Sequence, residues 1–175
     1  MGMRVDRPAT LEALPAIVDG WRLGGPLPVV ILVGGAGAMD GPAGRSAARA
    51  IDVEVLPAVQ AAGAALVTGG TDAGVMRLAG ERRRAIGGTF PLIGVVPVGL
   101  VEVPGDPIPA DGPVTPPIAQ VQPDHTHVLA VPGDRWGAET PWLFALAEGV
   151  AGGRPLVTVA LNGGTIARAE IAASV

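Results

Sequence analysis

Short apolar runs alternate with segments of helical periodicity along most of the chain. Five runs are continuous and rich in β-branched residues, which is typical of strands buried on both faces of a sheet; they cover 29–33, 64–68, 92–96, 127–131 and 156–161. Apolar residues at helical spacing predict helices over 10–21, 52–62, 72–86 and 140–151, with a short C-terminal helix from Thr165. Strands that alternate with helices predict a three-layer α/β fold: a mostly parallel sheet of five to seven strands with helices on both faces.

Two segments stand outside this alternation. Residues 1–28 read as an N-terminal helix and a lead-in, and residues 101–123 form a long Pro-rich, acidic stretch without periodicity. A loop of that length inside a compact domain is often functional, and here it is a candidate to fold over a bound ligand. No linker or repeat divides the chain, so we expect residues 1–175 to form a single domain.

The composition excludes several classes of protein. Of the 175 residues 49% are hydrophobic and 16% charged, which is unlike a disordered chain, and the net charge of −4 disfavours a nucleic-acid binder with a basic surface. The absence of cysteine excludes disulfides, thiolate metal sites and a cysteine nucleophile. The N-terminus carries Asp6, Glu12 and Asp19 and does not resemble a signal peptide, and no apolar run is long enough to span a membrane. We therefore expect a cytoplasmic protein.

Three of the expected strands end in a pair of glycines: Gly34-Gly35, Gly69-Gly70 and Gly163-Gly164. Ligands of open parallel sheets bind beyond the carboxyl ends of the strands, where glycine lets the backbone approach a ligand and a helix N-terminus attracts phosphate. Tight strand-to-helix turns also need glycine, but three pairs at one edge favour a phosphate or ribose site. The chain lacks both G-x-G-x-x-G in its usual context and a P-loop, which disfavours a conventional NAD dehydrogenase or P-loop NTPase.

A few polar residues are candidates for chemistry. Alternation places His125 and His127 on the same face at the start of a strand, where hydrogen bonds to neighbouring loops are expected; with no third ligand nearby, no metal site is predicted. The segment from Arg135 to Glu139 is either a helix start or a site where Arg135 contacts phosphate and Glu139 accepts hydrogen bonds from ribose. The triplet 82–84, all arginine, reads as a solvated helix end rather than a binding patch.

Five segments, in order, resemble the N-terminal homology region of melastatin-type TRP channels, which belongs to the SLOG superfamily. They are Thr68-Gly69-Gly70 with Gly74-Val75-Met76; Ile93-Gly94 with Pro97 and Gly99; His125-Thr126-His127; Arg135, Gly137 and Glu139; and Gly163-Gly164 with Thr165-Ile166. The resemblance covers roughly residues 29–172, and the chain looks like a stand-alone prokaryotic member of the group.

The resemblance implies a Rossmann-like fold that binds a nucleotide-derived ligand, with ADP-ribose as the example in some channels, and no further cofactor. Its ligand-binding positions fall on four loops and on the strand end at Pro97. These positions are Gly34, Gly35, Ala36 and Gly37; Gly69, Gly70 and Thr71; Arg135, Gly137 and Glu139; and Gly163, Gly164 and Thr165. Asn162 replaces the acidic residue of the channels, and two residues are missing before the Thr-Ile pair, so the last loop departs from the pattern.

Three functions stay open at this point. The first is a nucleotide sensor that acts through an effector protein or as a homodimer. The second is a phosphoribohydrolase of the Lonely-guy type, but the glutamate of that family's glycine motif is missing and Glu170 falls two positions too late, so Glu139 is the available carboxylate. The third is a protein-interaction module whose glycine loops bind no ligand.

Overall fold

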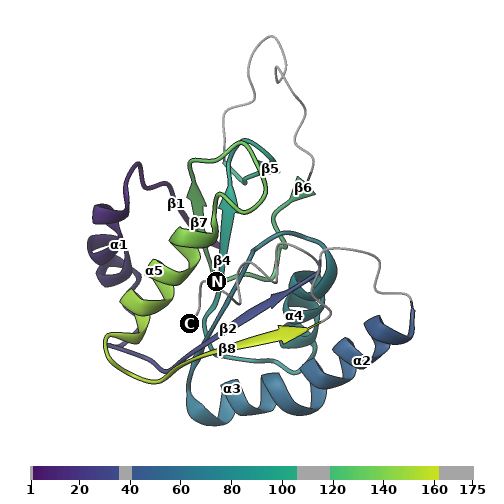
Figure 1. Cartoon of the computed structure of the whole chain (residues 1–175). Helices are drawn as coiled ribbons and strands as arrows, with labels where there is room; N and C mark the ends of the chain where they lie inside the picture. The colour runs from purple at the N-terminus through teal and green to yellow at the C-terminus, as the bar shows by residue number, and fades with distance from the viewer. Residues whose placement is uncertain (1, 36–40, 106–118, 162–175) are drawn as a thin grey trace.

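The computed structural model describes residues 2–35, 41–105 and 119–161 (Figure 1). Within these residues the central sheet has six strands in the order β1-β7-β4-β3-β2-β8, and each neighbouring pair is parallel. The strands are β1 (Arg4–Asp6), β2 (Val29–Gly34), β3 (Ala65–Thr68), β4 (Leu92–Pro97), β7 (His127–Val131) and β8 (Leu156–Leu161). The predicted Rossmann-like α/β fold is thereby confirmed.

Helices cover both faces of this sheet (Figure 1). On one face α1 (Leu14–Trp21) and α5 (Thr140–Ala151) pack against side chains that include Val67, Ile93 and Leu129. On the other face α3 (Leu56–Ala62) and α4 (Gly74–Ala85) enclose alternate residues of the same strands, such as Leu66 and Leu92. The strands are therefore apolar on both sides, which explains why their sequences are continuous apolar runs rather than alternating ones.

The helix predicted over 52–62 is longer than expected. It begins with α2 (Pro42–Ala50), passes through a π-helical turn at Ile51–Val55 and continues as α3. Pro57 lies at the start of α3 and has no N–H to donate, so the backbone widens in the turn before it. None of the helices in the described part of the chain is long and apolar enough to cross a membrane. The predicted helix from Thr165 lies outside the described residues.

The N-terminal segment is more than the predicted helix and lead-in. Residues 4–6 form the edge strand β1, which pairs in parallel with β7. Trp21, at the end of α1, donates from Nε1 to a carboxylate oxygen of Asp6 at 2.7 Å and so ties the helix to this strand. A three-residue strand without an apolar run gives no periodic signal, which is why sequence reasoning missed it.

The prediction of one structureless loop over 101–123 is wrong at both of its ends. Val101–Glu102 (β5) and Ala119–Gln120 (β6) pair as two short parallel strands, while residues 106–118 lie outside the described part. Val101, Val103 and Val121 are buried in a third apolar cluster against β4 and β7. These valines anchor the segment because their burial removes apolar surface from water.

Candidate functional site

The candidate site lies at the carboxyl edge of the sheet, where the loops after β2, β3, β4 and β7 emerge. Because the strands are parallel, these loops meet at one edge. The edge is stepped: Thr68, the last residue of β3, is level with Gly94, and β4 continues to Pro97. The glycine loop after β3 therefore lies against the side of β4 rather than beyond its end.

The second glycine loop holds two glycines with different roles. Gly70 has φ +71°, and a Cβ on it would lie 2.7 Å from Val96 Cγ1 and 3.0 Å from the Cα of Gly94, so the fold itself requires glycine there. Gly69 is half-exposed, lies outside the left-handed region, and a Cβ on it would meet nothing closer than Met76 Cγ at 4.0 Å. Packing therefore explains the glycine at 70 and leaves the glycine at 69 unexplained.

Thr71 follows in the same loop and is buried, with 4% of its surface exposed. Its backbone forms a bridge with Val121, the N–H of Asp72 donates to the carbonyl of Gln120, and the N–H of Gln122 donates to the carbonyl of Gly70. The loop after β3 is thus paired with the chain that leaves β6.

The first glycine loop is also shaped by packing. A Cβ on Gly34 would lie 2.3 Å from the carbonyl oxygen of Leu161 and 2.8 Å from both methyl groups of Val75, so glycine lets β8 and α4 approach β2. The carbonyl of Gly35 accepts from the N–H of Val75 in the first turn of α4. The other predicted site residues on the first and last loops lie outside the described residues: Ala36, Gly37, Gly163, Gly164 and Thr165.

The loops after β4 and β7 are packed together. A Cβ on Gly133 would lie 3.1 Å from the Cβ of Pro97 and 2.8 Å from that of Ala138, and the N–H of Gly99 donates to the carbonyl of Gly133 at 2.8 Å. Pro97 is therefore adjacent to the segment that carries the predicted residues Arg135, Gly137 and Glu139. Arg135 is exposed.

Glu139 is the buried carboxylate of this edge, with 6% of its surface exposed. It occupies the N-cap position of α5, and its Oε2 accepts from the N–H of Gly137 at 2.9 Å. Gly137 has φ +91°, a conformation that suits glycine and turns its N–H back to the carboxylate. Burial raises the pKa of Glu139 and outweighs the hydrogen bonds from its own N–H and that of Gly137, which lower it. A carboxyl group of this kind can accept hydrogen bonds from a ligand or supply a proton.

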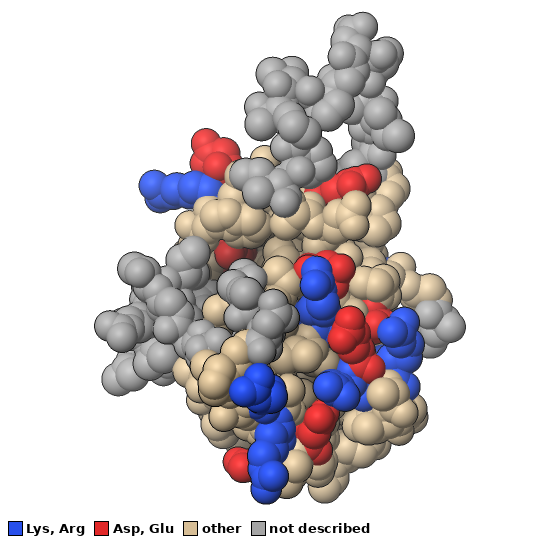
Figure 2. Space-filling view, turned by 90° about the vertical axis from the view of Figure 1, so that its right-hand side faces the viewer, with Lys and Arg blue, Asp and Glu red and all other residues tan. Residues whose placement is uncertain are grey.

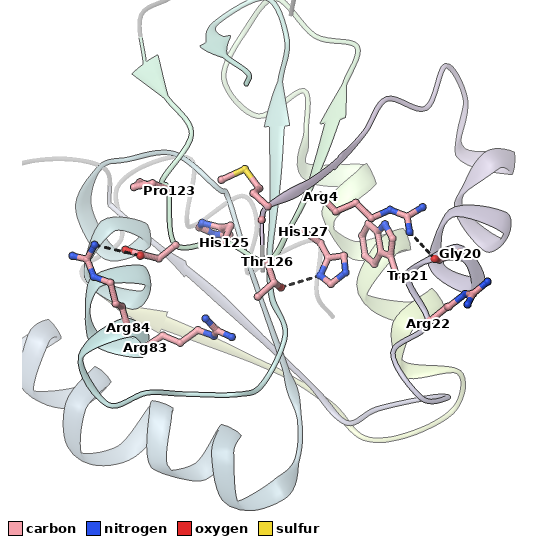
Figure 3. A pocket seen from close by; sticks show the side chains of 13 residues that line it. Arg4, Gly20, Trp21, Arg22, Arg83, Arg84, Pro123, His125, Thr126 and His127 are labelled. Carbon is pink, nitrogen blue, oxygen red and sulfur yellow. Dashed lines mark hydrogen bonds and ion pairs between the residues drawn. The ribbon is translucent and has the colours of Figure 1, made fainter. Parts of the chain in front are cut away.

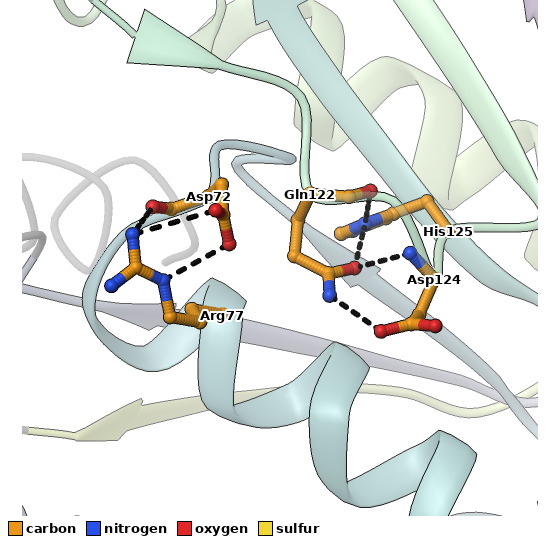
Figure 4. Close-up of polar contacts among 5 residues, drawn as sticks. All are labelled: Asp72, Arg77, Gln122, Asp124 and His125. Carbon is orange, nitrogen blue, oxygen red and sulfur yellow. Dashed lines mark hydrogen bonds and ion pairs between the residues drawn. The ribbon is translucent and has the colours of Figure 1, made fainter.

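Sequence reasoning missed a buried polar network behind the second glycine loop (Figure 4). His125 Nδ1 lies 3.1 Å from both the carbonyl oxygen and Oε1 of Gln122. On the other side of the ring, His125 Nε2 lies 2.9 Å from Thr68 Oγ1. Thr68 Oγ1 also accepts from the N–H of Gly70, and Gln122 Nε2 donates to Asp124 Oδ2 at 2.9 Å. The network joins the start of β7 to the glycine loop after β3.

The two histidines do not share a face, contrary to the expectation from alternation. His127 stacks on Trp21 with ring centroids 4.8 Å apart, on the α1 side of the sheet, whereas His125 reaches Thr68 on the α4 side. The reason is that β7 begins at His127, so the pattern of alternation does not extend back to His125. His125 makes the predicted hydrogen bond to a neighbouring segment, at Thr68, whereas the hydrogen bond of His127 is to the adjacent residue Thr126. In the described residues no three His, Asp or Glu side chains are grouped as metal ligands.

The sequence was compared with curated proteins and with models of protein families. A comparison with curated proteins found no match to the sequence. A family model described as SLOG in TRPM, prokaryote, matches residues 27–175, which include the strands β2 to β8 and the loops of the carboxyl edge. The chain belongs to this prokaryotic SLOG family.

Proposed function

We propose that this SLOG domain binds and senses a nucleotide-derived ligand, of which ADP-ribose is one example, at the glycine loops of the carboxyl edge. The observation that carries the proposal is Gly69, because neither its backbone conformation nor its packing requires glycine. A residue without a side chain leaves room for a phosphate or ribose to reach the backbone. Gly70 and Gly34, by contrast, are accounted for by the fold.

The segment after β7 would hold the other end of the ligand. Arg135 is exposed and free to form a charge-assisted hydrogen bond with a phosphate oxygen, and the buried Glu139 would accept from ribose hydroxyls. Both belong to the loop that packs on Pro97, which fixes their position relative to β4. The cytoplasmic location, the effector protein and the homodimer stay predictions.

Thermal denaturation with ADP-ribose, NAD, AMP, ADP, ATP and cyclic nucleotides tests the proposal. A ligand present at about 100 times its dissociation constant adds about 2.7 kcal/mol to the free energy of unfolding, which raises Tm by several degrees in a domain of this size. Gly69→Ala adds one methyl group where the fold has space, and we expect it to abolish the shift of the active ligand while leaving the unliganded Tm close to that of wild type.

Matched variants separate binding from general damage. Gly149→Ala adds a methyl group in α5, with Val18 Cγ2 at 3.8 Å as its nearest neighbour, and should keep the ligand shift. Arg135→Ala should lose the ligand shift. Arg154 is an exposed arginine after α5 at the opposite edge, and Arg154→Ala should keep the shift. Shifts that survive in both Gly69→Ala and Arg135→Ala would refute the site. The absence of a shift with every nucleotide would favour the interaction module.

A hydrolase that cleaves the N-glycosidic bond of a nucleotide is the second candidate, and Glu139 favours it. Cleavage at the sugar carbon needs a carboxyl group that donates or accepts a proton, and the raised pKa of Glu139 suits a general acid. Chromatography of each ligand after incubation tests this reaction. Release of free base by wild type and its loss in Glu139→Gln would establish the hydrolase; intact ligand recovered from a stabilised protein would establish the sensor.

A further inference from the structure

A second concave site lies at the opposite, amino edge of the sheet (Figure 3). It is a cavity of about 740 Å³ between the starts of β1 and β7 and the ends of α1 and α4. This volume is in the range of cavities that hold small molecules. Four arginines line it, namely Arg4, Arg22, Arg83 and Arg84, and Asp124 is the one carboxylate among the lining residues.

This concentration of positive charge contrasts with the rest of the protein. The chain has a net charge of −4 and 12 basic residues, so a third of them line one cavity. On the face seen in Figure 2 basic and acidic side chains are interleaved. Other arginines of the described residues lie in ion pairs, such as Arg77–Asp72 and Arg82–Asp52. Positive groups that converge on a concave surface concentrate the potential there and attract anions.

Two of the four arginines already have acidic partners. Arg84 lies 3.5 Å from Asp124, and Arg4 contacts Asp6 at 3.0 Å and the carbonyl of Gly20 at 2.6 Å. Arg83 forms no ion pair within 4.0 Å in the described residues: its Nε donates to the carbonyl of Phe90, and its guanidinium lies 5.3 Å from the centre of the Phe90 ring. It is half-buried, and burial lowers the pKa of Arg83 more than the charge of Asp124, which is paired with Arg84, raises it. A guanidinium that is partly removed from water, and whose nearby carboxylate is paired with another arginine, is a strong candidate to bind an anion.

The wall opposite Arg83 is aromatic and carries one more ring nitrogen. His127 stacks on Trp21, and its Nδ1 lies 2.9 Å from Thr126 Oγ1, which leaves Nε2 as the ring nitrogen for a ligand. Figure 3 shows Arg83 approaching from the α4 side, with Thr126 and His127 between it and Arg4. Basic groups from three separate elements thus surround one volume, which suits a compact ligand rather than an extended chain.

We propose that this cavity binds a small polyanionic molecule through phosphate or carboxylate groups, with Arg83 as its principal cationic contact and the exposed Arg22 as a further one at its rim. The site is separate from the glycine loops, because it lies at the other edge of the sheet and shares none of the residues assigned to the nucleotide. The proposal concerns binding alone and does not depend on the function proposed for the carboxyl edge.

Titration of the full chain with inorganic pyrophosphate and, separately, with citrate tests this site at constant ionic strength. The chain contains only two histidines, so NMR of their side chains reports directly on the cavity. A bound anion near His127 favours its protonated ring, and we expect saturable binding that raises the pKa of His127. Stronger binding of pyrophosphate would assign a phosphate ligand, and stronger binding of citrate a carboxylate ligand.

Variants of the lining residues test whether the anion binds in this cavity. Arg83→Gln and Arg22→Gln should each weaken binding roughly tenfold, as expected for loss of a hydrogen bond to a charged group. Arg22 is exposed, so its variant tests the site even if Arg83→Gln fails to fold. Arg154→Gln removes the same charge elsewhere, and Gly69→Ala alters the carboxyl edge; both should bind normally. No saturable shift of His127 with either anion, or equal weakening by Arg22→Gln and Arg154→Gln, would overturn the proposal.

Discussion

Protonation of His125 is expected to destabilise the protein, because each of its partners fits the neutral ring. The two oxygens of Gln122 that face Nδ1 can only accept, so Nδ1 carries the hydrogen and Nε2 accepts from the hydroxyl of Thr68. That hydroxyl accepts in turn from the N–H of Gly70. A second ring proton at Nε2 would face the hydroxyl hydrogen and deprive it of its acceptor. His125 is also buried, with 3% of its surface exposed.

The size of the effect follows from the pKa. Burial, the largest cause, lowers the pKa of His125 from 6.5 to about 4. The unfolded chain therefore takes up this proton at a higher pH than the folded protein, and folding stability falls as the pH drops below 6.5 and levels off below about 4. At 1.36 kcal/mol per pKa unit, His125 alone should remove about 2 kcal/mol from the free energy of unfolding between pH 7 and pH 5.

Urea denaturation of wild type and His125→Gln over this pH range isolates the contribution of His125. The pKa of His127 is also lowered, chiefly by burial, and adds a loss of the same sign, whereas the raised pKa of Glu139 acts in the opposite direction. Both groups are present in both proteins and cancel in the difference. The variant should be less stable at pH 7, and the gap should narrow by about 2 kcal/mol at pH 5. A gap that stays constant would show that His125 is not held neutral by this network.

Three further predictions concern single substitutions measured by urea or thermal denaturation at pH 7. Gly80→Ala should lower the free energy of unfolding by about 1–2 kcal/mol although alanine favours helices, because its Cβ would lie 2.1 Å from Gln122 Oε1. Gly149→Ala in α5 has no such neighbour and should raise the free energy of unfolding by up to about 1 kcal/mol. Equal effects of the two substitutions would contradict the packing argument. Gly34→Ala should cost about 2–3 kcal/mol through its collision with the Leu161 carbonyl, and a wild-type Tm would refute this. Glu139→Gln should raise Tm at pH 7 by removing a buried charge, and the gain should shrink as the pH falls, because protonation of the wild-type carboxyl group removes the same charge. A gain independent of pH would show that charge is not the cause.

The layers of the fold are readable in the sequence because both faces of the sheet are covered. Each of the five expected strands is a continuous apolar run, and each lies in the sheet within one residue of its predicted bounds. The strand β1 could not be found in the same way. Its position is fixed by pairing with β7 and by the hydrogen bond between Trp21 and Asp6, both of which join residues distant in sequence.

The candidate site was predictable as an edge of the sheet but not as a set of contacts. Pro97 at the end of β4, and Gly137 and Glu139 after β7, lie at the same edge because the strands are parallel. The tertiary partners of the loop after β3 do not, because they come from the segment 119–122, whose sequence has no periodicity. The same holds for Arg83: in sequence it belongs to a triplet that reads as solvated, but its three members turn to Asp52, Phe90 and Asp124.

Several glycines have a physical cause that does not depend on the proposed ligand. A Cβ on Gly80 would collide with the side chain of Gln122, and a Cβ on Gly94 would lie 2.7 Å from the Cα of Gly70 and 3.0 Å from His125 Cδ2. Glycines in α4, in β4 and in the loop thus make room for one buried polar network. Because that network accepts from the N–H of Gly70 and donates to its carbonyl, it fixes the backbone on which Gly69 is presented. A loop held in place before a ligand arrives loses less conformational entropy on binding, so under the proposed function the glycines required for packing would contribute to the affinity of the site at Gly69.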